Sequence, residues 1–313
     1  MEIKVVTYNI DGLPTKLDLK DLPWFLKPVT WIYKLIKGTT EVVINDNDNK
    51  EECMDLIGRY LKNSKADIIG VQEDFNYHEQ LAHYLEDYTQ GTYTGGMDLK
   101  GNIKWLPYPR FKADGLGLFA KSGIIKEEKI VTWNKSYGYF KHANDKLTQK
   151  GFRFYTINID KVNVDVYILH MDADFYNPDT CPNVSKDVEA RGSQLRQLSD
   201  FIKDRYLSGF NNPIIIMGDT NSSPDYQWDI DNIQENLITP IKGLPMTDIC
   251  EVVPDNARDV DRIFIINTVC SEYILVLSKC SYDLAFGKGD GKPSDHWVLS
   301  ATFTIKKAFW DYE

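Results

Sequence analysis

The chain is poor in the features that mark several classes of protein. Its five cysteines are odd in number and contain no CxxC pair, so we expect neither a disulfide framework nor a zinc site. No apolar run approaches the ~18 residues of a transmembrane helix. Internal repeats and low-complexity linkers are also missing, which predicts a single domain over residues 1–313.

Basic residues are in the minority. The chain has 36 Lys and Arg against 46 Asp and Glu, a formal net charge of −10. This balance argues against a protein that coats nucleic acid through a general basic surface, but not against an enzyme that uses a few cations to bind a phosphate. With 42% hydrophobic and 26% charged residues, the composition is that of a globular chain and excludes a disordered or fibrous one.

No signal peptide is visible at the N-terminus, because the strand-like run VVTYNI already begins at Val5. This favours a cytoplasmic protein. A chain whose leader has been removed would look the same and would be secreted or membrane-peripheral.

Two kinds of apolar pattern alternate along the chain. Apolar residues three and four apart predict helices around Met54 to Leu61 and Leu195 to Ile202. Short β-branched or aromatic runs predict strands. These runs are Ile3 to Ile10, Ile68 to Gln72, Gly115 to Ala120, Phe152 to Ile159, Val164 to His170, Ile214 to Gly218, Ile263 to Ile266, Tyr273 to Leu277 and Trp297 to Phe303. The pattern predicts an α/β or α+β protein with many strands.

An aromatic, lysine-rich insertion at about 15–45 departs from this pattern. Between Lys16 and Gly38, five lysines and two aspartates give a local charge of +3 in an acidic protein. A helix starting near Pro28 would place four apolar residues on one face and lysines on another, the composition of an interfacial helix. A helix docked on the core by its apolar stripe fits equally well. The candidate membrane contacts are Trp24, Phe25, Trp31 and Ile32.

Polar residues stand at the ends of several predicted strands. Each alone has an ordinary explanation, because Asn and Asp commonly cap turns. Together they indicate a site at one edge of an α/β scaffold, where strand ends converge. These residues are Asn9, Glu73, His170, Asp219, Asn221, Asp295 and His296.

Six ordered segments carry a family resemblance. TYNIDGLP, IIGVQED, ILHMDA, IIMGDTNSSP, DRIF and SDHW resemble, in that order, the motifs of the endonuclease/exonuclease/phosphatase superfamily, whose best-known fold is that of deoxyribonuclease I. The resemblance implies a four-layer α/β sandwich of two mixed β-sheets flanked by helices. It also implies metal-dependent hydrolysis of a phosphoester.

Phosphoester hydrolysis requires an activated water and neutralised phosphoryl oxygens, for which Mg²⁺ is well suited and Mn²⁺ is a substitute. Glu73 is the natural carboxylate ligand, with Asn9 beside it as oxygen donor or orienter. His296 is the leading general base because imidazole titrates near neutrality. The resemblance implies that Asp261 holds the ring of His296, which leaves Asp295 to face the metal or to orient His296.

The resemblance leaves the identity of the base open, because some members of the superfamily assign that role to the residue equivalent to Asp219. Asn221 and His170 are expected to contact the non-bridging oxygens, with His170 as a candidate cation or leaving-group acid. Asp172 is equally consistent with a loop cap. Arg191 and Gln194 lie at helical spacing, where a clamp on the loop after His170 is favoured.

The substrate must be inferred from peripheral features, because the fold does not determine it. HMDA, QKGFRF and ARGSQLRQL resemble the sphingomyelinase-like branch, and the last is shared with tyrosyl-DNA phosphodiesterases. With the 22–38 segment, this favours a phosphodiesterase acting on a membrane phospholipid headgroup, as a monomer without an obligate protein partner. The alternatives are a nuclease, an inositol-phosphate or phosphoinositide phosphatase, and a non-catalytic binding module. The last predicts gaps at the metal and base positions, which the sequence does not have.

Overall fold

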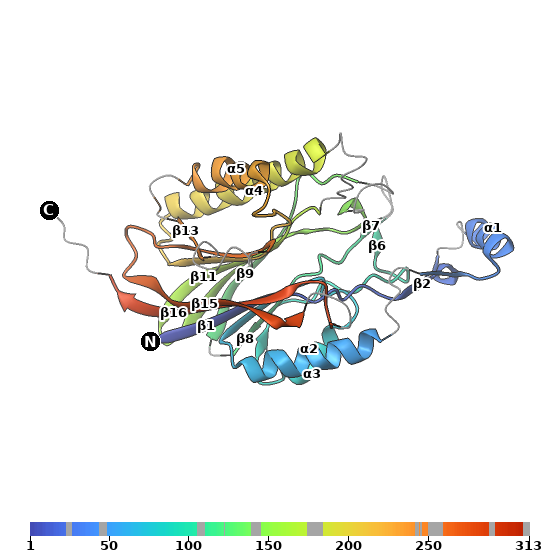
Figure 1. The fold of residues 1–313 in the computed structure, drawn as a ribbon, viewed down its shortest axis with the longest axis horizontal. Coiled ribbons are helices and arrows are strands. Elements are labelled where there is room, and N and C mark those ends of the chain that lie inside the picture. The colour runs from blue at the N-terminus through green and yellow to red at the C-terminus, as the bar shows by residue number, and fades with distance from the viewer. Residues whose placement is uncertain are drawn as a thin grey trace.

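The chain folds into two β-sheets packed face to face, with helices on both outer faces (Figure 1). This is seen in a computed structural model that describes residues 1–22, 27–43, 49–104, 110–121, 123–138, 145–173, 184–241, 244, 246–249, 259–287 and 292–308. The four layers confirm the predicted sandwich. Among the described residues, no helix combines the length and apolarity needed to cross a membrane.

The first sheet has six strands, and its only parallel pair among the described strands is β1 with β4. Its order is β15 (Tyr273–Gly287), β16 (Trp297–Lys307), β1 (Glu2–Asn9), β4 (Ile68–Gln72), β8 (Gly117–Ala120) and β5 (Thr89–Gln90). Helices α2 (Lys50–Ser64) and α3 (His78–Tyr84) cover its outer face, where Met54, Ile57 and Leu61 of α2 are buried.

The second sheet also has six strands and pairs β11 with β12 in parallel. Its order is β13 (Met246–Asp248), β14 (Asp261–Ile266), β12 (Ile214–Asp219), β11 (Val162–His170), β10 (Gly151–Ile159) and β9 (Gly123–Thr132). Helix α4 (Val184–Leu207) buries Leu195, Leu198 and Ile202 against its outer face, and α5 (Gln227–Ile233) lies beside α4 (Figure 1).

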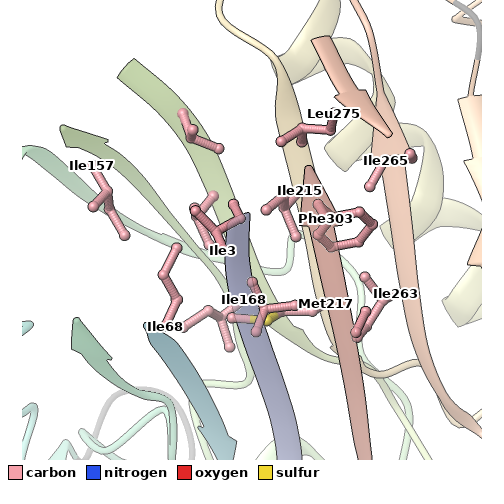
Figure 2. Packing of buried hydrophobic residues seen from close by; sticks show 14 of the residues in the cluster. Ile3, Ile68, Ile157, Ile168, Ile215, Met217, Ile263, Ile265, Leu275 and Phe303 are labelled. Carbon is pink, nitrogen blue, oxygen red and sulfur yellow. The ribbon is translucent and has the colours of Figure 1, made fainter. Parts of the chain in front are cut away.

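The space between the sheets is filled by apolar side chains from both. Figure 2 shows Ile3 and Ile68 of the first sheet close to Ile168 and Met217 of the second. Gly70 of β4 allows this approach, because a Cβ there would lie 2.8 Å from the Met217 side chain. The two sheets are therefore held at a spacing set by their inner residues.

All nine predicted strands are present, but β9 was not predicted. Its centre is the charged run Lys126 to Lys129, which interrupts the apolar pattern that marks a strand. Charged residues are common on edge strands because they discourage pairing with other chains. The predicted strand ending at Leu277 continues to Gly287 through two irregularities in register.

The insertion forms an arm that projects from the sandwich (Figure 1). Strands β2 (Lys16–Asp18) and β3 (Glu41–Val43) pair in antiparallel fashion, and α1 (Lys27–Lys37) lies at the far end. Trp31, Leu35 and Ile36 are 65%, 72% and 71% exposed, so docking of the apolar stripe on the core does not occur. Trp24 and Phe25 lie outside the described residues. A smaller pair, β6 (Ile103–Lys104) and β7 (Arg110–Phe111), is found near the arm.

A buried ion pair fixes the loops on this side of the molecule. Arg153 of β10 is fully buried, and its Nε and Nη2 donate to the two carboxylate oxygens of Asp114 at 2.7 and 2.6 Å. Nη2 also donates to Thr94 Oγ1 at 3.3 Å. The pair therefore ties β10 to the segment that leads into β8.

We expect Asp114→Ala to lower the free energy of unfolding by about 3–5 kcal/mol, because it removes the carboxylate hydrogen-bonded to the buried guanidinium. Among the described residues, only Glu128 Oε1 would then remain as a carboxylate partner, 3.8 Å from Nη1. Urea unfolding would measure the loss. In Asp114→Ala/Arg153→Met, where both charges are removed, most of the stability should return. A loss below ~1 kcal/mol in the single variant would show that water or another group compensates the cation.

Candidate active site

The polar residues predicted at the strand ends meet at one edge of the sandwich. In the first sheet Asn9 ends β1 opposite Gln72, so Glu73 follows directly beside it. In the second sheet His170 is paired with Asp219, and Asp219 with Asp261. Strand register alone therefore places residues far apart in sequence side by side, and the site is built from both sheets.

The turn that carries Glu73 has an unusual backbone. Glu73 has φ 59°, in the left-handed region that non-glycine residues rarely adopt. Gly12 packs against this turn, since a Cβ at Gly12 would lie 2.4 Å from the Glu73 carbonyl oxygen. Asn9 Oδ1 accepts the Asp11 backbone N–H at 3.0 Å, which fixes the neighbouring loop. Such strain is common at functional sites.

Asn9 lies between two carboxylates. Its Nδ2 donates to Glu73 Oε1 at 3.1 Å and to Asp219 Oδ2 at 3.0 Å. Burial raises the pKa of Glu73 to about 7, although the positive charge of Lys150 opposes the shift. The two acidic groups thus lie close together where solvation is poor, an arrangement that a cation would stabilise.

His170 faces the same carboxylates from β11. Its Nε2 is 3.4 Å from Asp219 Oδ2 and 3.9 Å from Glu73 Oε1, and its Nδ1 has no hydrogen bond among the described residues. Burial and the positive charges of Lys150 and His296 hold the pKa of His170 well below its ordinary value. A lowered pKa favours the neutral imidazole over the predicted cation.

His296 and Asp261 form a close pair across the two sheets. His296 Nδ1 lies 2.7 Å from Asp261 Oδ2, and Nε2 is directed to Asp219 Oδ2 at 3.8 Å. Burial alone would lower the pKa of His296, but the carboxylates of Asp261 and Asp219 outweigh burial and hold it well above its ordinary value. The predicted contact between His296 and Asp261 is present, with the other ring nitrogen facing the site.

Asp295 is at the rim of the site. Its side chain is 76% exposed, and Oδ1 lies 3.8 Å from His296 Nε2. Its carboxylate also raises the pKa of Glu73, so both predicted roles, facing the metal and orienting His296, stay open. Asn221 is on the opposite side, where Asp219 Oδ1 accepts its backbone N–H at 2.9 Å and its Nδ2 donates to the Met171 carbonyl at 3.0 Å.

The three support residues hold the loop after His170. Gln194 Nε2 donates to Asp172 Oδ1 at 2.7 Å, and Gln194 Oε1 accepts the Asp172 backbone N–H at 3.1 Å. Arg191 is fully buried, donates to Asp229 Oδ1 at 2.7 Å and reaches the Asp172 carbonyl at 3.4 Å. Their contacts are those of a clamp between α4, α5 and the loop.

A pocket of about 440 Å³ adjoins Glu73 and His170. Its polar end also holds Lys150, whose Nζ is 2.5 Å from Asp145 Oδ1 and donates to the Met171 carbonyl at 3.3 Å. Lys150 and Asp145 were not predicted, because neither follows a strand in a recognisable motif. The remaining walls are mainly apolar, from Leu13, Leu17, Val43, Phe75, Met97, Phe111 and Leu147.

The donor set suits a hard divalent cation. Asp219, Asp261 and His296 offer ligand atoms within 4.8 Å of one another. Because Asp261 already binds His296 Nδ1, we favour instead Glu73 as the carboxylate ligand, with Asn9 orienting it through Nδ2. Glu73 Oε2 has no hydrogen bond among the described residues, and Mg²⁺ prefers carboxylate and amide oxygens.

Comparison with known proteins supports the fold. Three solved structures share the fold at low identity. D. rerio TDP2 complexed with a single strand DNA product has a TM-score of 0.62 and 15% identity, and the match covers 97% of this chain and 99% of that one. A Staphylococcus aureus beta toxin mutant with bound magnesium ions has a TM-score of 0.60, 17% identity and coverage of 96% and 99%. Sphingomyelinase C from Streptomyces griseocarneus has a TM-score of 0.60, 14% identity and coverage of 96% and 99%.

A search of curated proteins finds no match. The profile of the Endonuclease/Exonuclease/phosphatase family, however, matches residues 6–296 and so includes every residue of the converging set described above. On that match, the chain belongs to the endonuclease/exonuclease/phosphatase family and is a metal-dependent phosphoric ester hydrolase.

Proposed function

We propose that the chain is a Mg²⁺-dependent phosphodiesterase that hydrolyses a phospholipid headgroup, in the manner of a sphingomyelinase. The observation that supports this most is the pocket beside Glu73 and His170, which is polar at one end and apolar along its walls. A phospholipid presents a matching arrangement, because its phosphodiester is joined through a short polar linkage to long apolar chains. Pockets that bind such ligands combine apolar walls with a few placed polar groups.

The charges near the site favour a lipid over a nucleic acid. A nucleic-acid groove requires cations that track a chain of phosphates. Lys150 is the one cation of the described pocket lining, and Asp145 binds it. Lys50 forms an ion pair with the carboxylate of Asp11, so its charge is also compensated. Among the described lining residues, the pocket therefore offers little uncompensated positive charge for a second phosphate.

The site residues have separate roles in phosphodiester hydrolysis. Water attacks phosphorus, a new P–O bond forms, and the P–O bond to the lipid alcohol breaks. We assign the water proton to His296 Nε2, with Asp261 holding the ring from Nδ1. Asp219 Oδ2 is less suited to accept it, because nitrogens of Asn9, His170 and His296 already face that oxygen. The leaving alkoxide takes a proton from solvent, His296 later returns its proton to solvent, and the balance is one phosphomonoester and one alcohol.

His170 and Asn221 would support the phosphoryl group. His170 Nε2 faces the site 3.4 Å from Asp219 Oδ2, and Asn221 is held nearby because its Nδ2 donates to the Met171 carbonyl. Glu73, oriented by Asn9, would hold Mg²⁺, which when bound would neutralise phosphoryl charge and lower the pKa of water.

Vesicles that contain sphingomyelin test the proposal. We expect Mg²⁺-dependent release of phosphocholine from the purified protein, complete loss with EDTA, and restoration by added Mg²⁺ or Mn²⁺. Supercoiled plasmid, single-stranded oligonucleotide and phosphoinositides form the comparison panel. Nicking of plasmid without phosphocholine release would assign the enzyme to the nucleases.

The pair of His296 and Asp261 predicts how kcat/KM depends on pH. A base must first lose its own proton, so kcat/KM should rise with pH through a pKa above the ordinary His value of about 6.5. Asp261→Asn removes a carboxylate that raises this pKa, so the rise should move to lower pH while the maximal rate falls about 10²-fold or more. Asp231→Asn, on the exposed side of α5, is the matched control. A rise that stays in place would exclude His296 as the group observed.

A further inference from the structure

We propose that α1 docks the enzyme on anionic membranes by burying the face formed by Trp31, Ile32, Leu35 and Ile36 in the lipid interface. This inference rests on the proposed function, because it specifies how an enzyme of this kind would reach its substrate. The four residues are half or more exposed, while large apolar side chains are normally buried.

The helix is attached to the arm by its other side. Thr30 is buried, and its Oγ1 donates to the Leu19 carbonyl at 2.8 Å. Leu19 in turn donates its backbone N–H to the Thr40 carbonyl at 2.9 Å, which links the helix base to the end of the arm. The apolar face is thus directed away from the contacts that hold the helix.

The positive charge of α1 favours an anionic lipid surface as the partner. Helix α1 contains Lys27, Lys34 and Lys37 and no acidic residue, although the whole chain carries a net charge of −10. All three lysines are exposed. An apolar stripe bordered by lysines matches an anionic lipid surface, where apolar burial and electrostatic attraction add. A neutral or cationic partner would lose the electrostatic part.

The position of the arm connects docking to the site. Leu17 of β2 and Val43 of β3 line the pocket beside Glu73, and the same two strands carry α1 (Figure 1). A membrane bound at α1 would therefore lie on the side of the molecule from which the arm contributes to the pocket wall. The substrate phosphate would then enter the polar end of the pocket, with the lipid body along the apolar walls.

Binding is measured first without turnover, with EDTA present so that no headgroup is released. We would sediment the protein with vesicles of phosphatidylcholine and phosphatidylserine that lack sphingomyelin. The wild type should bind, more weakly at high salt and on pure phosphatidylcholine. The triple variant Trp31→Ser/Leu35→Ser/Ile36→Ser should lose at least ~10-fold in affinity, because three exposed side chains that would enter the interface become polar.

Two matched controls replace exposed apolar residues away from the arm. Leu207→Ser at the end of α4 and Ile124→Ser on the edge strand β9 alter side chains that are 80% and 70% exposed. They should bind vesicles as the wild type does. Thermal unfolding of each variant should be unchanged, since no buried contact is removed.

Activity assays separate the two proposals. On a soluble phosphodiester the triple variant should match the wild type, whereas on sphingomyelin vesicles it should be slower by the factor lost in binding. Vesicle binding without phosphocholine release would leave docking intact and refute the lipid substrate. Equal vesicle binding by wild type and triple variant would overturn the docking proposal. If the substitutions also converted a dimer to a monomer, the apolar face of α1 would be a contact between two copies of the chain instead.

Discussion

His296→Ala is expected to lower kcat for phosphodiester hydrolysis by about 10³–10⁴-fold, the usual cost of removing a positioned proton-transfer group. The side chain is the only imidazole of the described site that is paired with a carboxylate at hydrogen-bond distance. Substrate binding should change little, because His296 Nε2 faces Asp219 at 3.8 Å rather than the apolar walls of the pocket. Steady-state kinetics on phosphocholine release would separate kcat from KM.

His83→Ala is the matched control for this variant, since His83 is exposed on α3. It should retain wild-type kcat. If His296→Ala lost less than about 10-fold, the assignment of the water proton to His296 would be wrong, and Asp219 would become the leading base.

Glu73→Gln should produce two effects of opposite sign. In the presence of EDTA the variant should be more stable than the wild type above pH 7, because a buried carboxylate whose pKa is raised to about 7 no longer has to ionise. The gain should be roughly 1–3 kcal/mol. With millimolar Mg²⁺ the wild type alone should gain stability, since its carboxylate would hold the ion.

Catalysis by Glu73→Gln should require at least about 10²-fold more Mg²⁺ than catalysis by the wild type. A titration of activity and of melting temperature with Mg²⁺ would measure both effects. Glu79→Gln, at an exposed position on α3, controls for loss of charge. An unchanged Mg²⁺ requirement would mean that the ion is held elsewhere, with the group of Asp219, Asp261 and His296 as the alternative.

The sequence predicts those site residues that stand at the ends of strands. Asn9, Glu73, His170 and Asp219 stand at ends of apolar runs, and their meeting depends only on which strands are neighbours. The partner of His296 came from the resemblance, because nothing local connects Asp261 to a residue 35 positions away. Lys150 and Asp145 could not be recognised, since their pairing depends on how a loop closes over the pocket.

The helix of the arm shows another limit of the sequence. Apolar residues three and four apart produce the same pattern whether a helix faces the core or the solvent. Only the position of the arm, which carries α1 away from the sandwich, distinguishes the two for Trp31 and Leu35. Strand β9 was not predicted because its charged centre lacks the apolar pattern of a strand. Such a centre is tolerated at the edge of a sheet, but the sequence does not show which strands lie at an edge.

The division of the site between the two sheets makes catalysis sensitive to their alignment. Asn9 contacts Asp219 across the interface, and His296 contacts Asp261 across it as well. A small slide of one sheet over the other would break both contacts while leaving each sheet intact. The apolar layer around Gly70 and Met217 fixes the spacing of the two sheets. It therefore also fixes the distances between site residues that belong to different sheets. Bulky replacements there would first appear as loss of turnover in a protein that is still folded.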